Sequence, residues 1–338
     1  MKVAFLTGGT GFVGANLARL LLAEGWRVRA LARPGSDRRN LAGLDLELVD
    51  GDLTDPGLEP ALRGADAVFH VAAHYSFWRK EREALLRSNV GGTRNVLAAA
   101  RRAGVPRTIY TSSVAAIGVK HGGVADESFQ SPPEELIGTY KLSKYLAERE
   151  ALAAAAAGQD VVIVNPTTPL GPWDRKPTPT GEILVRFLSG KMPALVETGL
   201  NFVDVADVAR GHLLAYERGR SGERYILGGE NLPLRRLLQR VGAEVGREAP
   251  RWSIPPWLPL GVAWIDEGLL GRLGRTPSVP IDAVRMSQES MYYDASKARL
   301  ELGFTPSPID EAIRAAIRWF AENGYFPQTG DKRQALWQ

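Results

Sequence analysis

Short apolar runs alternate with helical patterns over residues 3–164 of the chain. The runs that predict strands are 3–7, 27–32, 46–49, 67–71, 107–111 and 161–164. The patterns that predict the main helices between them are 12–24, 81–103 and 139–156. Strands that alternate with helices form a parallel sheet covered on both faces, so each strand can be apolar throughout. The pattern therefore predicts an α/β fold of the Rossmann type, with a doubly wound parallel sheet.

The pattern changes after Asn165, where prolines become frequent up to Thr180. Helices are predicted at 181–189, 205–218 and 309–323, and one more strand of the sheet at 224–227. Residues after 231 read mostly as helices and loops. We therefore predict a dinucleotide-binding domain of 1–164 plus about 200–228, a smaller, mostly helical substrate lobe of 165–199 plus 229–327, and a disordered polar tail, 328–338.

Composition narrows the class of protein. Hydrophobic residues make up 44% and charged residues 24%, as in ordinary globular proteins, and the net charge of +4 is spread along the chain, which gives no argument for nucleic-acid binding. The absence of cysteine excludes disulfides and thiolate catalysis, and histidines 70, 74, 121 and 212 lack metal-ligand spacing, so no metal is expected. No apolar run is long enough to span a bilayer, and a cytoplasmic location is expected.

A glycine-rich turn follows the first predicted strand and opens the first helix. Its glycines are Gly8, Gly11 and Gly14, in a G-x-x-G-x-x-G spacing. Glycines there permit a tight turn, close approach to a pyrophosphate and close packing of helix on sheet. The helix start then offers free N–H groups and a positive dipole end to a phosphate. We expect the residues of this turn to bind a dinucleotide: Gly8, Thr10, Gly11, Phe12, Val13 and Gly14.

The end of the second predicted strand bears on the choice of cofactor. NAD enzymes usually carry an Asp or Glu about 20 residues past the turn to hold the ribose hydroxyls. This chain has Arg33 at that corner, which is suited to pair with a 2′-phosphate, although a solvated loop arginine is a serious alternative. NADP(H) is therefore favoured, with NAD(H) as the other option. Asp52, followed by Leu53, is positioned to accept a hydrogen bond from the adenine amino group or simply to form a turn.

Tyr140 and Lys144 supply the candidate chemistry. Residues four apart on a helix share a face, so the phenol and the ammonium can point into one cleft. A phenol titrates near 10 and is a poor base at neutral pH, and a neighbouring ammonium is expected to lower that pKa. Tyr140 can then exchange a proton with a substrate hydroxyl or carbonyl. Ser113, at the end of the fifth strand, is expected to hydrogen-bond the reacting oxygen, and Ser112 to satisfy backbone groups.

These motifs resemble an extended short-chain dehydrogenase/reductase of the NAD-dependent epimerase/dehydratase type over nearly the whole chain. The stretches that carry the resemblance are the glycine turn, Gly51–Leu53, Val68–Ala73, Asn89–Thr93, Thr111–Ser113, Tyr140 with Lys144, Asn165–Thr167 and Phe202–Ala209. The resemblance implies catalysis by Ser113, Tyr140 and Lys144, with Asn89 supporting the active-site helix. It also implies cofactor contacts from Ala72, Pro166, Thr167 and Thr168. We further expect cofactor contacts from Ala73, Thr111, Ser112, Tyr140 and Lys144, a small-molecule substrate and a homodimer.

Several functions stay open within that resemblance. The chain is similar to hopanoid-associated sugar epimerases and to dihydroflavonol reductases, so both a ketone or aldehyde reductase and an epimerase are expected alternatives. Val114 and Ala115 stand where the family's dehydratases carry an acidic pair, which disfavours dehydration. Leu200 and Asn201 stand where nucleotide-sugar epimerases often carry a diphosphate-binding arginine, which weakens that reading. A dinucleotide-binding regulator without catalysis is the alternative of another class.

A tryptophan-rich segment, 252–265, has no role in these motifs. Packing in the second lobe or at a dimer contact is the simpler interpretation, at roughly two to one. The sharper interpretation is a wall for an apolar, isoprenoid-linked substrate, or a weak contact with a membrane surface. Among the histidines, His70 ends a buried strand and is expected to be a packed, hydrogen-bonded core residue.

Overall fold

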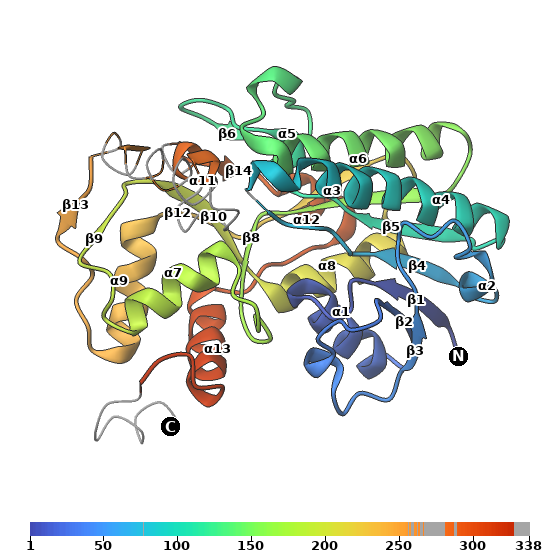
Figure 1. The fold of residues 1–338 in the computed structure, drawn as a ribbon, viewed down its shortest axis with the longest axis horizontal. Helices are drawn as coiled ribbons and strands as arrows, with labels where there is room; N and C mark the ends of the chain where they lie inside the picture. The colour runs from blue at the N-terminus through green and yellow to red at the C-terminus, as the bar shows by residue number, and fades with distance from the viewer. Residues whose placement is uncertain are drawn as a thin grey trace.

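A large parallel sheet forms one end of the molecule and a smaller group of helices and strands the other, in the computed structural model of the chain (Figure 1). The structure describes residues 1–76, 78–255, 257, 260, 261, 263, 266, 281–286 and 289–327. The predicted tail, 328–338, and residues 256, 258, 259, 262, 264 and 265 of the tryptophan-rich segment lie outside these residues.

The large sheet has seven parallel strands in the order β11-β7-β5-β4-β1-β2-β3. Their bounds are β1 (Val3–Thr7), β2 (Arg27–Ala32), β3 (Glu47–Asp50), β4 (Ala67–His70), β5 (Arg107–Thr111), β7 (Val161–Pro166) and β11 (Arg224–Leu227). The strand order reverses between β1 and β4, which is where ligands bind in open sheets of this kind. The predicted Rossmann-type fold is confirmed.

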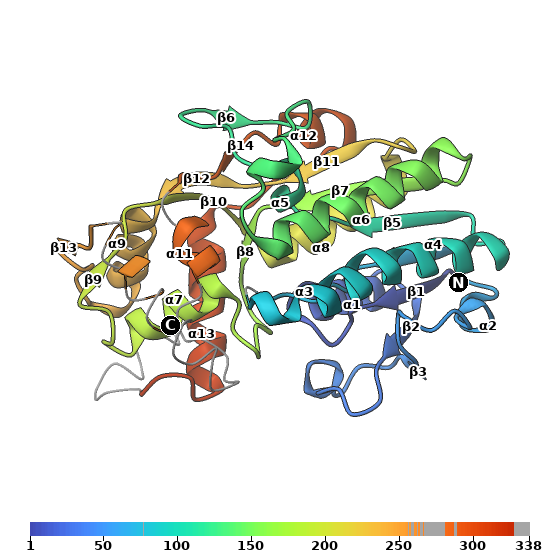
Figure 2. The same ribbon diagram turned by 45° about the horizontal axis from the view of Figure 1, so that its top comes forward.

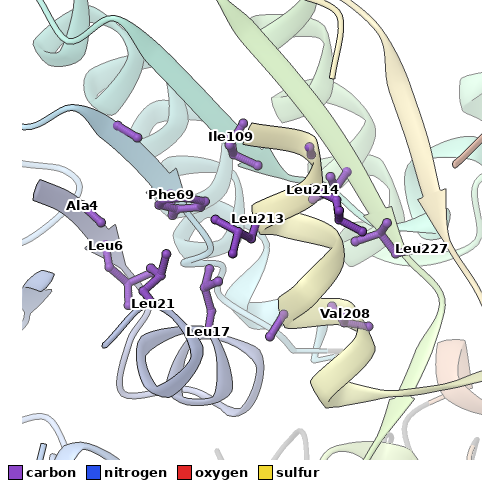
Figure 3. Close-up of a cluster of buried hydrophobic side chains, with 14 of the residues drawn as sticks. Ala4, Leu6, Leu17, Leu21, Phe69, Ile109, Val208, Leu213, Leu214 and Leu227 are labelled. Carbon is purple, nitrogen blue, oxygen red and sulfur yellow. The ribbon is translucent and has the colours of Figure 1, made fainter. Parts of the chain in front are cut away.

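Helices cover both faces of this sheet. On one face α1 (Phe12–Ala23) and α8 (Val205–Arg218) pack together on the strands, and Figure 3 shows Leu17, Leu21 and Leu213 directed toward Leu6 and Phe69. On the other face lie α2 (Glu59–Leu62), α4 (Gly92–Arg102) and α6 (Gly138–Ala156), along the sheet in Figure 2. Buried on both faces, these strands need no polar side, which explains their continuous apolar runs.

The long helix predicted over 81–103 is interrupted. It consists of α3 (Arg82–Leu86), a π-helical turn at Arg87–Gly91 and then α4. Periodicity did not reveal the turn, because one extra residue shifts the pattern only slightly. Such turns are common at functional sites, and this one carries Asn89.

The second lobe contains a small sheet that the sequence pattern did not predict. Its order is β12 (Glu230–Pro233), β10 (Gly199–Asp204) and β8 (Thr168–Leu170), and α7 (Pro179–Leu188), α9 (Leu234–Val245) and α13 (Ile309–Glu322) share one apolar core with it. The strands are short and contain Asn and Pro, and β10 pairs with segments about 30 residues away, so local patterning carries little signal. The expectation of mostly helices and loops after 231 missed β12. The boundary drawn near residue 200 stays a prediction.

The remaining α-helices and strands are short. They are α5 (Val114–Ile117), α11 (Ile281–Met286) and α12 (Ser296–Leu302), and the paired strands β6 (Val124–Ala125) with β14 (Tyr292–Tyr293) and β9 (Ala194–Leu195) with β13 (Trp252–Ser253). None of the helices among the described residues has the length and apolar character needed to cross a membrane.

Candidate active site

The glycine turn between β1 and α1 forms a cradle of backbone. Gly8 has a φ of +74°, and a Cβ there would lie 2.6 Å from the amide nitrogen of Ala72 on the neighbouring strand end. A Cβ on Gly14 would lie 2.1 Å from the carbonyl oxygen of Gly8. Gly11 precedes α1 without a capping side chain, so the first N–H groups of the helix stay free for a phosphate. The cradle therefore fits a dinucleotide pyrophosphate. Thr10, Phe12 and Val13 lie in it, partly buried.

Arg33 lies directly after β2, where its positive charge is open to a ligand. Arg33 is exposed, and no ion pair is recorded for it within the described part of the chain, whereas Arg38 pairs with Asp50 and Arg39 with Asp37. Asp52 Oδ1 accepts hydrogen bonds from the backbone and hydroxyl of Thr54 at 2.8 and 2.7 Å. These bonds, and the nearby charge of Arg33, hold the pKa of Asp52 below its usual value. Asp52 thus forms the turn that was expected as its simpler role, and Leu53 follows beside Gly92.

Ser113, Tyr140 and Lys144 are brought together at the carboxyl end of β5. Ser113 begins α5, and its hydroxyl accepts the Ala115 amide at 3.1 Å. The Ser113 side chain lies close enough to the Tyr140 phenol to lower the pKa of that phenol. Lys144 is 3% exposed, and its Nζ donates to the Thr111 carbonyl at 2.8 Å. The predicted arrangement of phenol, hydroxyl and ammonium is therefore present as geometry.

The expected electrostatic effect of Lys144 on Tyr140 is wrong for this structure. Burial raises the pKa of Tyr140 to about 12, because it disfavours the phenolate, and only the neighbouring Ser113 side chain opposes this effect. The Lys144 ammonium is directed at Thr111 and lies 5.3 Å from the ring centre of Tyr110. Burial lowers its own pKa to about 8, against the charge of Glu148. The phenol is therefore protonated at neutral pH, in the form of an acid.

Asn89 ties the π-helical turn to the helix that carries Tyr140. Its Nδ2 donates to Ser143 Oγ and to the His74 carbonyl, each at 2.9 Å, while its Oδ1 accepts the His74 amide at 2.6 Å. Ser143 Oγ in turn donates to the Tyr140 carbonyl at 2.7 Å. This geometry matches the supporting role that the resemblance implies.

The other predicted contacts surround the same edge of the sheet. The Ala72 amide donates to Thr7 Oγ1 at 3.2 Å beside Gly8, and Ala73 is exposed next to it. Ser112 is buried, and its backbone amide donates to the Val164 carbonyl. Its hydroxyl has no hydrogen-bond partner among the described residues, so the expectation that this side chain satisfies backbone groups is wrong. Pro166 ends β7, and Thr167 and Thr168 lead half-buried into β8.

His70 is a packed core residue, as predicted. Its Nδ1 lies 2.7 Å from Thr7 Oγ1 and its Nε2 lies 3.0 Å from Thr93 Oγ1. Burial and the charge of Lys144 lower its pKa to about 3, so it stays neutral. Among the described residues no group of His, Asp or Glu is arranged to hold a metal ion.

Four polar residues next to the site, three of them buried and Arg224 half-buried, were missed or given no role by sequence reasoning. His212 Nε2 meets the Thr111 hydroxyl at 2.8 Å, and burial lowers its pKa to about 4. Glu148 pairs with Arg224 at 3.1 Å and accepts a hydrogen bond from Asn165 at 2.7 Å. Two signals were available: the position of Glu148, one turn beyond Lys144 on the same helix, and that of Asn165, in a stretch that carries the family resemblance.

Comparison with known proteins decides the family. The model of the NAD dependent epimerase/dehydratase family matches residues 4–228. The chain belongs to that family. A protein of Synechocystis sp., provisionally named a dihydroflavonol 4-reductase, is 59% identical over 95% of each chain. Sterol demethylase protein B of Methylococcus capsulatus is 38% identical over 94% of this chain and 98% of its own. A solved nucleoside-diphosphate-sugar epimerase of Pseudomonas aeruginosa is 32% identical, with a TM-score of 0.79 over 96% of this chain and 99% of its own.

The family and these relatives establish the general activity. The chain is an enzyme of the extended short-chain dehydrogenase/reductase type, an NAD(P)-dependent oxidoreductase or epimerase. Reductase names and an epimerase name both occur among the relatives, so the choice between the two rests on the site.

Proposed function

We propose that this enzyme is an NADP(H)-dependent reductase that interconverts a ketone or aldehyde and the corresponding alcohol. The observation that carries the proposal is the protonated Tyr140 phenol beside the Ser113 side chain just after β5, on the sheet edge that also bears the glycine turn. The names of two relatives, a dihydroflavonol 4-reductase and a sterol demethylase protein, support carbonyl chemistry on a large apolar substrate.

Each residue of the site has a role in this proposal. The dinucleotide, when bound, supplies or accepts the hydride. Ser113 holds the reacting oxygen by a hydrogen bond, and Tyr140 gives that oxygen its proton in reduction or removes it in oxidation. Lys144 would hold the nicotinamide ribose through its ammonium. Asn89 keeps the start of α6 in place through Ser143.

Arg33 supports NADP(H) over NAD(H). It is exposed, has no recorded ion pair within the described residues and lies directly after β2, where a 2′-phosphate would approach. Replacing Arg33 by Ala should weaken NADPH binding roughly tenfold and leave NADH binding unchanged, because one charge-assisted contact contributes about 1.5 kcal/mol. Fluorescence titration of both cofactors measures this. Arg39→Ala, which removes the exposed partner of Asp37, is the control. Equal losses for both cofactors would refute the assignment.

The alternative within the family is epimerisation, in which the hydride returns to the opposite face of the substrate. For nucleotide sugars one observation counts against it. Asn201 is 1% exposed, and its Nδ2 donates to Asn231 at 2.8 Å, so this position is engaged inside the small sheet instead of offering a cation to a diphosphate. Net consumption of NADPH separates a reductase from an epimerase, which consumes none.

The decisive experiment follows NADPH fluorescence with a panel of apolar ketones and aldehydes. We expect stoichiometric oxidation of NADPH with at least one of them. Tyr140→Phe should lower turnover at least 10³-fold and preserve NADPH binding, since only the acid is removed. Tyr145→Phe, a half-buried tyrosine of the same helix, should keep full activity. Unchanged turnover in Tyr140→Phe would refute the role of the phenol.

We also expect a homodimer in the cytoplasm, with no nucleic-acid partner. Light scattering of the purified chain tests the dimer. Of the tryptophan-rich segment, Trp252 and Trp257 are 77% and 69% exposed. Exposure of these two rings favours a substrate wall, a dimer contact or a membrane-surface contact over packing in the core of the second lobe.

A further inference from the structure

A buried carboxylate lies one turn beyond Lys144 on α6. Glu148 is only 2% exposed. Its Oε2 accepts a hydrogen bond from Asn165 Nδ2 at 2.7 Å, and its Oε1 lies 3.1 Å from Arg224 Nη1. A carboxylate taken from water is stable only when it is paired and hydrogen-bonded, and Glu148 has both kinds of partner. Its charge is thus fixed in place beneath the active site.

Glu148 is linked to Ser113 through Asn165. The same Asn165 Nδ2 donates to the carbonyl oxygen of Ser113 at 3.0 Å, and Asn165 is fully buried on β7. Ser113 is the N-cap of α5, and its backbone is extended. The amide held by Glu148 therefore fixes the backbone from which the Ser113 hydroxyl projects toward Tyr140.

Glu148 is also linked to Lys144. Residues four apart on a helix are neighbours on one face. Burial lowers the pKa of Lys144 to about 8, and the negative charge of Glu148 acts in the opposite direction. Without that charge a larger fraction of Lys144 would be neutral at physiological pH.

We propose that Glu148 is a positioning residue of the active site, which orients Ser113 through Asn165 and keeps Lys144 in its ammonium form. The contacts of Glu148 with Asn165 and Arg224 do not depend on the function of the protein. The catalytic importance of Ser113 and Lys144 rests on the proposed function.

The charged groups around Glu148 allow the pKa of Lys144 to be shifted either down or up by substitution. Besides Lys144, the titratable groups near Glu148 are Tyr110 on β5 and Arg224 on β11. Arg224 also donates to the Glu127 carbonyl, and Lys297 donates to the Arg224 carbonyl at 2.9 Å. Arg224 is thus the counter-charge of Glu148. Loss of Glu148 and loss of Arg224 should move the titration of Lys144 in opposite directions.

The test is the titration of Lys144 in the full chain without ligand, followed by NMR of ¹³Cε-labelled lysine and assigned with Lys144→Arg. Glu148→Gln should lower the pKa of Lys144 by about one unit, and Arg224→Gln should raise it by a similar amount. Glu150→Gln is the matched control, because Glu150 lies on the same helix but pairs with Arg94 at the surface. Thermal unfolding verifies that each variant is folded.

Turnover against pH is the second readout. In Glu148→Gln the alkaline limb of the profile should move down with the Lys144 titration. Asn165→Ala should lower turnover without moving that limb, because the charge remains, and Glu148→Asp should restore the position of the limb. An unmoved Lys144 titration in folded Glu148→Gln overturns the proposal. If Glu148→Gln does not fold, an unchanged pKa of Lys144 in Arg224→Gln overturns the proposal instead. Absence of turnover in the wild type would overturn the proposed function, while the titration still decides the role of Glu148.

Discussion

At the scale of single residues, the site is built from buried ionisable groups whose charge states are set by desolvation. Tyr140 stays protonated and His70 and His212 stay neutral, while Lys144 is held near the point where it loses its charge. Burying an ammonium costs free energy that a surface lysine does not incur. We therefore expect the active site to be a source of instability in the ligand-free protein.

Lys144→Met should stabilise the ligand-free protein while it abolishes turnover. The pKa of Lys144 is about 8 in the folded chain and near 10.5 when exposed, so the buried charge costs stability below pH 8. Between pH 8 and 10.5 the folded state releases this proton first, and the cost disappears. We expect a gain of roughly 1–3 kcal/mol at pH 7 that shrinks as pH rises through that window. Urea unfolding at several pH values measures it. Lys120→Met, at an exposed position, should change stability by less than about 0.5 kcal/mol, and a gain independent of pH would contradict the argument.

At the scale of elements, the irregular turns position the chemistry and the regular strands support it. Asn89 lies in the π-helical turn between α3 and α4 and serves the backbone of His74 and the side chain of Ser143 at once. A regular helix would rotate the residues after the turn relative to those before it. The turn therefore lets one asparagine join the loop after β4 to the helix α6 that bears Tyr140.

Asn89→Ala should destabilise the protein by roughly 2 kcal/mol or more, because it leaves several buried polar groups without a partner. Asn95→Ala, on the same helical run, removes a single half-buried bond to the Leu53 carbonyl and should cost about 1 kcal/mol. Denaturant unfolding of the two variants gives the comparison. Equal losses of unfolding free energy in the two variants would show that the hydrogen bonds of Asn89 contribute no more to stability than the single bond of Asn95.

The contrast between regular strands and irregular turns also explains which parts of the fold and the site could be predicted from the sequence. Strands β1, β2, β4, β5 and β7, the glycine turn and the Ser113, Tyr140 and Lys144 set follow from local apolar runs and short motifs. The small sheet and the π-helical turn do not, because pairing of β10 with β8 and β12 is decided by partners far along the chain. The Glu148–Arg224 pair joins residues 76 apart, so no local pattern contains it. The pKa of Tyr140 was misjudged because burial, which no motif reveals, raises it, and because Lys144 is directed at the Thr111 carbonyl.

At the scale of the whole molecule, one loop of the second lobe contacts the dinucleotide cradle. Trp173 has a φ of +73°, the one positive value outside glycine among the described residues, and the guanidinium carbon of Arg19 on α1 lies 3.4 Å from its ring centre. Asn16 Nδ2 donates to the Pro172 carbonyl at 3.0 Å. Asn40 Nδ2 donates at 3.1 Å both to the Trp173 carbonyl and to the Thr10 carbonyl in the glycine turn. Strained backbone held by several contacts is typical of functional loops.

Asn40→Ala should uncouple this loop from the cradle. In the wild type, bound NADPH should slow amide exchange both at residues 8–14 and at residues 171–178, because Asn40 bridges Thr10 and Trp173. In the variant we expect protection of 8–14 to persist and that of 171–178 to be lost, with NADPH affinity lowered a few-fold. Hydrogen exchange followed by mass spectrometry measures both segments in one experiment. Asn323→Ala, which removes a bond to the Trp319 carbonyl at the far end of α13, should leave both protections intact. If 171–178 stays protected in Asn40→Ala, the two lobes are coupled through other contacts, of which Arg19 on Trp173 is the next to remove.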